Sequence, residues 1–466
     1  MPKALPIPTT EKALAINLDN GRYGTFAEIG AGQEVVRWFF QVGGAAGTVA
    51  KSISAYDMTM SDTIYGKADR YVSRPRLESM LNYEQNLNIE RLTERASSTA
   101  FFSFANTVSA RNYLGTNSCH GWMGMKFQAN PGDESSQIVI HVRMLDPTNA
   151  MQQEALGIVG VNLIYGACVN HNDPDDIMES LLDGLSIQRI EIDMIEFSGP
   201  CFSEIDNRLM SLKLVEMGLS NAAMFGPDGR VIQPSNVLRK RPLLVERGSF
   251  RPFSNAHRDL LRAAHENFCA EPDVEEGEIL QIAELTMSKL MEEGAIDYKD
   301  FLARADMLLA CGMTVLISNY FEYYRLAQYL RLHTDNKIAI TIGMAGLKMV
   351  LNEKYYEHLA GGILEAFGRL FKHDLAFHVY PSMDRDTREI CTVHNLKLGD
   401  EIRHLYRHLL ERGYIKPLDN YDEDSIDVYS REVLKMIKNQ DSKWENMVPS
   451  EVRDVIKENG YMGYTG

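Results

Sequence analysis

The sequence lacks the features that mark disulfide-rich, zinc-binding, membrane-spanning and exported proteins. None of the six cysteines stands in a CxxC pair, so the sequence predicts neither a disulfide framework nor a zinc site, and we expect reduced thiols. No apolar run reaches the ~18 residues that a membrane helix requires. Residues 1–8 carry three prolines and do not resemble a targeting segment. We therefore expect a cytoplasmic protein.

Positive charge is also in short supply. The 48 Lys and Arg residues face 64 Asp and Glu residues, which gives a formal net charge of -16. An acidic surface repels both nucleic-acid backbones and anionic membranes, so we expect neither as a partner. The remaining composition, 45% hydrophobic and 24% charged over 466 residues, is typical of a globular chain of two or three domains.

Short apolar segments alternate with helical patterns, most clearly in the second half of the chain. Strands are predicted there at residues 243–245, 314–318, 338–342 and 376–380, and helices at residues 257–268, 278–293, 298–311 and 320–332. This alternation is typical of a parallel sheet with helices on both faces. The predicted fold class is α/β, with two α/β halves, the second built on a mainly parallel sheet covered by helices on both faces.

A polar, proline-bearing and basic stretch at residues 233–241 marks the expected division between the halves. We predict four parts in the chain. They are an N-terminal arm at residues 1–20, a first α/β domain at 21–238, a second α/β domain at 239–385, and a helical C-terminal region at 386–466.

The most informative segment joins the strand at residues 243–245 to the helix at 257–268. It reads Gly248-Ser249-Phe250-Arg251-Pro252-Phe253-Ser254-Asn255-Ala256-His257. A strand, a glycine turn and a helix start in this order form the place where α/β proteins bind phosphate groups. The alternative is a purely structural turn, in which Gly248 ends the strand and Pro252 shapes the chain.

This segment resembles the first signature of the nucleotidyltransferase α/β family, G-x-F-x-P-x-H-x-x-H. Gly248, Phe250, Pro252 and His257 fall on pattern positions, and Ser254 stands in place of the first His. The resemblance implies that residues 239–385 are nucleotidyltransferase-like. It also implies phosphate contacts and a reaction site, with Mg²⁺ as cofactor if a nucleotide is used. The implied ligand-binding residues are Gly248, Ser249, Phe250 and Ser254, and the implied catalytic residues are Arg251 as a charge clamp and His257 as a donor to the transition-state oxygens.

Most of the chain also resembles a family of uncharacterised bacterial proteins, through residues 42–51, 198–200 and 244–252. Members often carry the automatic names "TonB-dependent receptor" or "nicotinate-nucleotide adenylyltransferase". The first name requires a signal peptide and many strands with an outward apolar face, neither of which we expect here. The second name agrees with the signature at Gly248.

Two further strand ends are candidate ligand contacts. Ser318 and Asn319 follow one predicted strand, and Gly343 and Gly346 follow another. Ligands of open α/β sheets usually lie at such carboxyl ends, where hydroxyl, amide and backbone N–H groups are available to a phosphate or carboxylate. The same residue types also serve as plain turn residues. No metal-ligating set is predicted.

Two functions follow from these observations. The first is a transferase that binds a nucleotide or another phosphorylated small molecule. The alternative is a non-catalytic, self-assembling scaffold, which the 21 tyrosines and 23 methionines would suit as association surfaces. Formation of a homo-oligomer is an expectation under either function.

Overall fold

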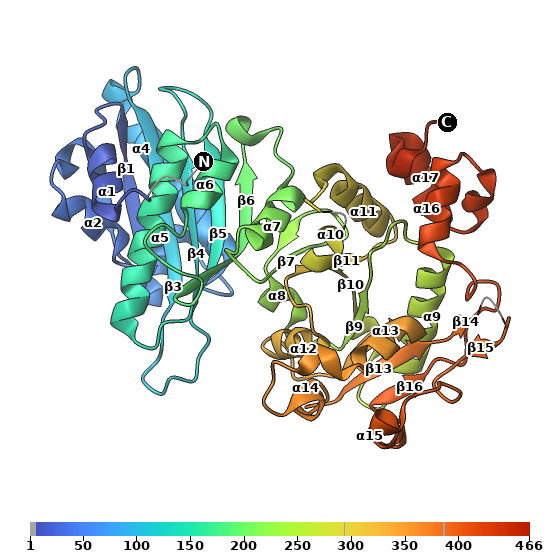
Figure 1. The fold of residues 1–466 in the computed structure, drawn as a ribbon. Helices are drawn as coiled ribbons and strands as arrows, with labels where there is room; N and C mark the ends of the chain where they lie inside the picture. The colour runs from blue at the N-terminus through green and yellow to red at the C-terminus, as the bar shows by residue number, and fades with distance from the viewer. Residues whose placement is uncertain (1–5, 293, 385–386) are drawn as a thin grey trace. The chain divides into compact units, whose positions relative to one another are not determined.

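The computed structural model describes residues 6–292, 294–384 and 387–466. The chain divides into two compact units, Met1–Ser220 and Asn221–Gly466, and each unit has its own sheet with helices packed on it (Figure 1). The predicted α/β fold class is therefore confirmed. The division lies earlier than the predicted 238/239, because the hairpin of β7 (Ala222–Phe225) and β8 (Val231–Ile232) belongs to the second sheet.

The first unit contains a six-stranded sheet in the order β2-β1-β3-β4-β5-β6. The strands are β1 (Arg22–Gly30), β2 (Val49–Ile53), β3 (Ala100–Ser109), β4 (His120–Phe127), β5 (Ser136–Met144) and β6 (Ile190–Ser198). β1 runs parallel to β2 and β3, and β3 to β6 are antiparallel neighbours. Phe26, Phe104 and Met125 are wholly buried in the core of this unit.

Helices cover both faces of the first sheet. They are α1 (Thr9–Asn17), α2 (Val35–Gln41), α3 (Met58–Tyr65), α4 (Arg74–Arg91), α5 (Asn149–Val169), α6 (Pro174–Ser180) and α7 (Asn207–Glu216). The expected arm at residues 1–20 is in fact helical over Thr9–Asn17, and its residues 1–5 lie outside the described part of the chain. Lys12 fixes this helix, since its Nζ donates to Asn162 Oδ1 at 2.9 Å and to Asp183 Oδ2 at 2.7 Å.

The second unit contains an eight-stranded sheet in the order β16-β13-β12-β9-β10-β11-β7-β8. Besides β7 and β8, its strands are β9 (Leu243–Arg247), β10 (Leu280–Thr286), β11 (Thr314–Ser318), β12 (Ile338–Gly343), β13 (Leu375–Tyr380) and β16 (Ile415–Pro417). These six run parallel to one another, and β7 pairs with β11 and with β8 in antiparallel fashion. A small ribbon of β14 (Ser382–Met383) and β15 (Ile390–Cys391) stands apart.

The helices of the second unit are distributed over both faces of its sheet. They are α8 (Pro234–Leu238), α9 (Asn255–Cys269), α10 (Met287–Leu290), α11 (Tyr298–Ala310), α12 (Tyr323–Arg331), α13 (Met344–Val350), α14 (Gly362–Leu370), α15 (Asp400–Glu411), α16 (Ser430–Lys438) and α17 (Ser450–Asn459). Leu243 and Val245 of β9 join the core with α12, α13 and α14. Because side chains alternate along a strand, Leu244 and Glu246 face the other side, where α9 contacts β9 and β12.

One predicted helix is wrong. In this stretch, Leu280–Thr286 form strand β10 and Met287–Leu290 form the short helix α10, whereas Glu293 lies outside the described residues. The segment contains good helix formers, but Ile282 and Leu285 are wholly buried between two parallel neighbours. Tertiary pairing therefore overrides local propensity here.

The connections of the second sheet create a switch point. The chain passes from β9 to β10 and β11 on one side and then returns to β12 on the other side of β9. In open α/β sheets, ligands bind outside the carboxyl ends of the strands at such a point. A ligand-binding site is therefore expected at the carboxyl ends of β9 and β12.

All six cysteines are free thiols, as the sequence predicts. Among the described helices, none combines the length and apolarity needed to span a bilayer.

Candidate functional site

A cleft of about 620 Å³ opens where β9 and β12 end side by side. The first turns of α9 and α16 border it as well; its lining includes Glu246, Ser254, His257, Gly343, Gly346, Tyr380, Arg431 and Lys435. Four residues predicted from the sequence as site residues, Ser254, His257, Gly343 and Gly346, are thereby brought together. We call this space the switch-point cleft.

His257 stands at the first turn of α9 and is held by its neighbours. Its Nδ1 accepts the backbone N–H of Ser254 at 3.0 Å, and its ring lies 5.3 Å from the rings of both Phe250 and Phe253. Burial lowers the pKa of His257 to about 4, so the imidazole is neutral at pH 7. Because Nδ1 is the acceptor, the proton is on Nε2. His257 is therefore a fixed neutral N–H donor.

The Gly248–Phe250 pair of the family signature has a packing role in this chain. A Cβ at Gly248 would lie 2.8 Å from Cε1 of the wholly buried Phe250, closer than side-chain carbons approach. The backbone N–H of Gly248 donates to the carbonyl oxygen of Glu284 at 3.2 Å, and the carbonyl oxygen of Ser249 accepts from Arg304 at 3.1 Å. These groups are engaged within the protein and hold the turn in shape.

Arg251, predicted as a charge clamp, points to another partner. Its Nε donates to Asp300 Oδ1 of α11 at 2.8 Å. Arg304 also pairs with Asp300, so the aspartate ties the turn after β9 to α11. Among the described residues that line the switch-point cleft, the cations are Arg247, Arg431 and Lys435.

Arg247 at the end of β9 forms one wall of the cleft and pairs with Glu284 of β10. Its Nε and Nη2 donate to the two carboxylate oxygens of Glu284 at 2.7 and 2.9 Å, and its guanidinium lies 4.3 Å from the Tyr323 ring centre. Ser318 donates to Glu284 Oε1 at 2.6 Å. The hydroxyl of Ser318, predicted as a ligand contact, therefore supports Glu284 at the end of β10. Asn319 is exposed, and its backbone N–H donates to the carbonyl oxygen of Asn221 at 2.9 Å.

A second, smaller cavity of about 280 Å³ lies on the other side of this wall. Arg247, Tyr323 and Gly346 line both spaces. The remaining lining of the smaller cavity mixes aromatic, aliphatic and polar residues, and includes Phe321, Tyr355 and Tyr356 beside Gly248, Lys289 and Glu322. We call it the aromatic cavity.

Glu246 is the most unusual group of the switch-point cleft. Its side chain is 3% exposed, and its Oε2 is buried without a hydrogen-bond partner among the described residues. Burial raises the pKa of Glu246 well above its usual range. A neutral carboxyl group that borders a cavity offers a hydroxyl donor and a carbonyl acceptor to whatever enters.

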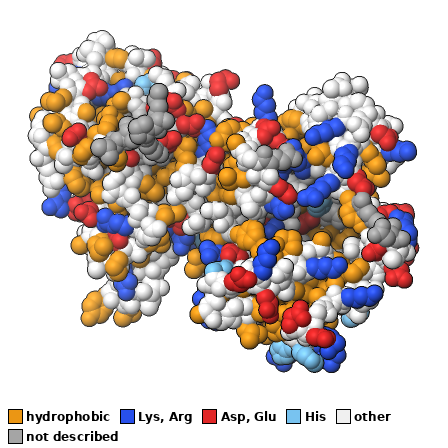
Figure 2. All heavy atoms as spheres, viewed as in Figure 1, with side chains coloured by type: hydrophobic (Ala, Val, Ile, Leu, Met, Phe, Trp, Pro, Cys, Tyr) orange, Lys and Arg blue, Asp and Glu red, His pale blue; other side chains and the backbone are white. Residues whose placement is uncertain are grey.

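Positive charge reaches the cleft from the C-terminal part of the chain. α16 contributes Ser430, Arg431 and Lys435 to the lining, and Ser430 donates to Ser254 Oγ at 3.4 Å. Figure 2 shows Lys and Arg side chains gathered over α16 and beside the hollow next to it. The first turns of α9 and α16 thus meet at one point, and helix N-termini favour anions.

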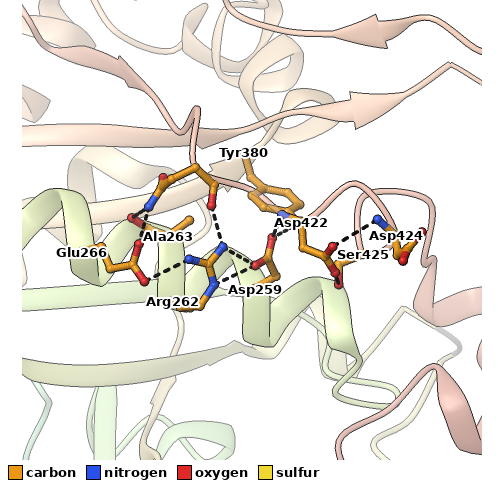
Figure 3. A network of polar contacts seen from close by, with 9 residues as sticks. Asp259, Arg262, Ala263, Glu266, Tyr380, Asp422, Asp424 and Ser425 are labelled. Carbon is orange, nitrogen blue, oxygen red and sulfur yellow. Dashed lines mark hydrogen bonds and ion pairs between the residues drawn. The ribbon is translucent and has the colours of Figure 1, made fainter.

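A polar network positions the segment that leads into α16 (Figure 3). Asp259 Oδ2 accepts from the Tyr380 hydroxyl at 2.6 Å and from the backbone N–H of Asp422 at 2.7 Å. Arg262 pairs with Asp259 and donates to the carbonyl oxygen of Asn420 at 2.5 Å. Residues 419–427, a loop with five acidic residues, are therefore held against α9 by these hydrogen bonds.

Sequence reasoning missed Glu246, Tyr380, Arg431 and Lys435. Glu246 follows Val245 in an apolar strand, and a charged residue in a buried strand is a usable signal. Arg431 and Lys435 follow Glu246 by more than 180 residues. No local pattern connects them to β9, so only the fold brings them to the cleft.

The first unit contains a separate perturbed carboxyl group. Glu28, at the end of β1, accepts the backbone N–H groups of Val35 and Val36 at 3.0 and 3.3 Å and Nδ2 of Asn106 at 3.2 Å. Burial raises the pKa of Glu28 to about 7, although these hydrogen bonds act to lower it. Glu28 consequently titrates near neutral pH and caps the start of α2.

No family model matches the chain, and no curated protein is similar to it at a significant level. Solved structures are similar at low identity. Plasmodium falciparum nicotinic acid mononucleotide adenylyltransferase complexed with APC covers 48% of this chain and 98% of its own, at 11% identity and a TM-score of 0.30.

Two further solved structures belong to competence/damage-inducible proteins. CihA from Agrobacterium tumefaciens covers 35% of this chain and 96% of its own, at 17% identity and a TM-score of 0.25. A CinA superfamily protein from Enterobacter cloacae covers 34% and 90%, at 14% identity and a TM-score of 0.25. Similarities this low assign neither an activity nor a site residue to the chain.

Proposed function

We propose that the second unit binds a phosphorylated small molecule, of the nucleotide class, in the switch-point cleft. The observation that carries this proposal is the convergence of the neutral His257 donor with Arg431 and Lys435 at the meeting point of two helix N-termini. All of these groups favour an anion with several acceptor oxygens.

Glu284 and Glu246, two of the carboxyl groups beside the cleft, oppose a bound anion less strongly than two free carboxylates would. Glu284 is neutralised by its bidentate pair with Arg247. Burial raises the pKa of Glu246 well above its usual range, which favours its neutral form. Glu432 of α16 also lines the cleft, and Arg431 pairs with Glu292 at 3.2 Å. The charge that a ligand meets from α16 is therefore the balance of Arg431 and Lys435 against Glu432.

The size and lining of the site favour a nucleotide over free phosphate. The switch-point cleft of about 620 Å³ is within the range of small-molecule sites. The adjoining aromatic cavity presents Phe321, Tyr323 and Tyr355, and aromatic side chains stack well on planar bases. Phosphates in the cleft and a ring in the aromatic cavity would place Gly346, which lines both, beside the bound molecule.

The finer proposal is nucleotidyl transfer. In that reaction an acceptor oxygen forms a bond to the α-phosphorus, and pyrophosphate leaves with the bonding electrons. His257 would donate Nε2–H to a non-bridging oxygen, where charge increases in the transition state. Mg²⁺ would arrive with the nucleotide phosphates, because a neutral Glu246 is a weak ligand for it.

The experiment that tests the proposal exploits the helix cap at His257. Glu and Gln are both good residues at this position, because the side chain at N3 accepts the N-cap backbone N–H. We therefore expect His257→Glu and His257→Gln to fold equally well. His257→Glu places a negative charge in the cleft and should weaken ATP binding at least tenfold relative to His257→Gln in calorimetric titrations with Mg²⁺.

Equal ATP affinities for the two His257 variants would refute a phosphate site at the start of α9. Radiolabelled pyrophosphate exchange into ATP, measured with a panel of mononucleotide acceptors, then tests transfer separately. Binding without exchange would leave the ligand site intact and remove the transferase proposal.

A further inference from the structure

Three potential metal ligands meet at the other end of α9. His265 and Cys269 are four residues apart on this helix, and Glu276 belongs to the short 3-10 helix Glu276–Glu278 that follows. Their ligand atoms all lie within 4.8 Å of one another. Within the described part of the chain, none of the three side chains has a hydrogen-bond or ion-pair partner outside this group.

We propose that His265, Cys269 and Glu276 bind a zinc ion, with one coordination position left to water. Sulfur at about 2.3 Å and nitrogen at about 2.05 Å from a tetrahedral zinc lie roughly 3.6 Å from each other. Cys269 Sγ lies 3.6 Å from His265 Nδ1. The two helical ligands therefore already stand at the separation that a shared zinc ion requires.

The chemistry of the donors selects the metal. A thiolate and an imidazole are soft and borderline ligands, which suit Zn²⁺ and not Mg²⁺ or Ca²⁺. Coordination releases the Cys269 thiol proton to solvent. The resulting thiolate and the Glu276 carboxylate together carry two negative charges, which a divalent ion neutralises. Glu276 is exposed, so its carboxylate is free to rotate towards the ion.

The site is separate from the switch-point cleft. Eight residues of α-helix, from His257 to His265, correspond to about 12 Å along the axis. The ion would fasten the segment between Cys269 and β10 to the C-terminal end of α9. We therefore assign it a stabilising role, in which it holds the helix whose other end borders the cleft.

The test uses the full-length chain, reduced and freed of metal with a chelator. Titration with Co²⁺ should give one equivalent of binding with a thiolate-to-cobalt charge-transfer absorption, and one equivalent of Zn²⁺ should displace it. Cys269→Ser should abolish this absorption and weaken binding at least tenfold. Cys311→Ser, a matched change at a half-buried thiol at the end of α11, should leave both unchanged.

Glu276→Gln provides a variant at an exposed position that does not threaten folding. It should weaken Co²⁺ binding while keeping the charge-transfer absorption, since the thiolate is still bound. Absence of one-to-one binding by the wild type, or unchanged affinity in Cys269→Ser, would overturn the proposal and leave the 3.6 Å contact as an ordinary thiol–imidazole hydrogen bond.

Discussion

The stability of the first unit should depend on pH through one buried carboxyl group. Glu28 is 2% exposed, and burial raises its pKa from an ordinary value of 4.5 to about 7. Below pH 4.5 the group is protonated in both the folded and unfolded states and contributes nothing. Between pH 4.5 and 7 the unfolded chain releases the proton while the folded unit retains it, so stability falls as pH rises.

The size of the effect follows from the difference in pKa. About 2.5 pKa units at 1.36 kcal/mol each correspond to roughly 3 kcal/mol, lost between pH 4.5 and 7 and constant above pH 7. Glu28→Gln has the same shape and does not titrate. The unfolding free energy of the wild type relative to Glu28→Gln should therefore fall by about 3 kcal/mol between pH 4.5 and pH 8.

Tryptophan fluorescence provides the assay. Of the three tryptophans, Trp38 and Trp122 lie in the first unit, and Trp444 lies in the second. Urea unfolding in a Trp444→Phe background thus reports on the first unit alone. The exposed Glu90→Gln on α4 serves as the control and should show no such trend. A difference between wild type and Glu28→Gln that stays constant with pH would refute the reasoning.

Two further predictions concern the turn after β9. Arg247→Lys keeps the positive charge but loses the bidentate pair with Glu284, and should destabilise the second unit by about 1.5–3 kcal/mol, measured by urea unfolding followed at Trp444; a loss below about 0.5 kcal/mol would contradict it. Gly248→Ala places a carbon 2.8 Å from Phe250 and should cost roughly 1–3 kcal/mol. Gly368→Ala, at an exposed helical site with open space, should instead stabilise the second unit by roughly 0.5–1 kcal/mol. Equal effects of Gly248→Ala and Gly368→Ala on the unfolding free energy would be inconsistent with the close contact between Gly248 and Phe250.

The sequence was informative about the fold where local chemistry and tertiary context agree. Residues 314–318 contain three β-branched residues and an apolar centre, and they form β11 as predicted. Residues 280–286 form a central strand although they contain Gln281 and Glu284, and polar residues of this kind argue against a buried strand. The strand is tolerated because Arg247 of β9 pairs with the Glu284 carboxylate. That compensation is a property of the assembled sheet and has no local signature.

The same distinction applies to the two candidate sites. Ser254, His257 and Gly343 were predictable, since strand ends and helix starts mark the edge of a parallel sheet. Lys435 was not, because its approach to the cleft depends on the loop fastened by Asp259 and Asp422. The metal-ligand group was not predictable either, since it contains a single cysteine and no CxxC pair marks it in the sequence.

One comparison on α16 tests the central claim most directly. Lys435 lines the switch-point cleft, and Lys438, one turn later on the same helix, does not belong to its lining. Both are exposed, so neither alanine variant should disturb folding. Loss of a cation that contacts phosphate costs about 1.4 kcal/mol or more, which is about tenfold in affinity. Calorimetric titration with ATP and Mg²⁺ should show binding weakened about tenfold in Lys435→Ala and unchanged in Lys438→Ala. Equal affinities, or no binding by the wild type, would contradict a nucleotide site in this cleft.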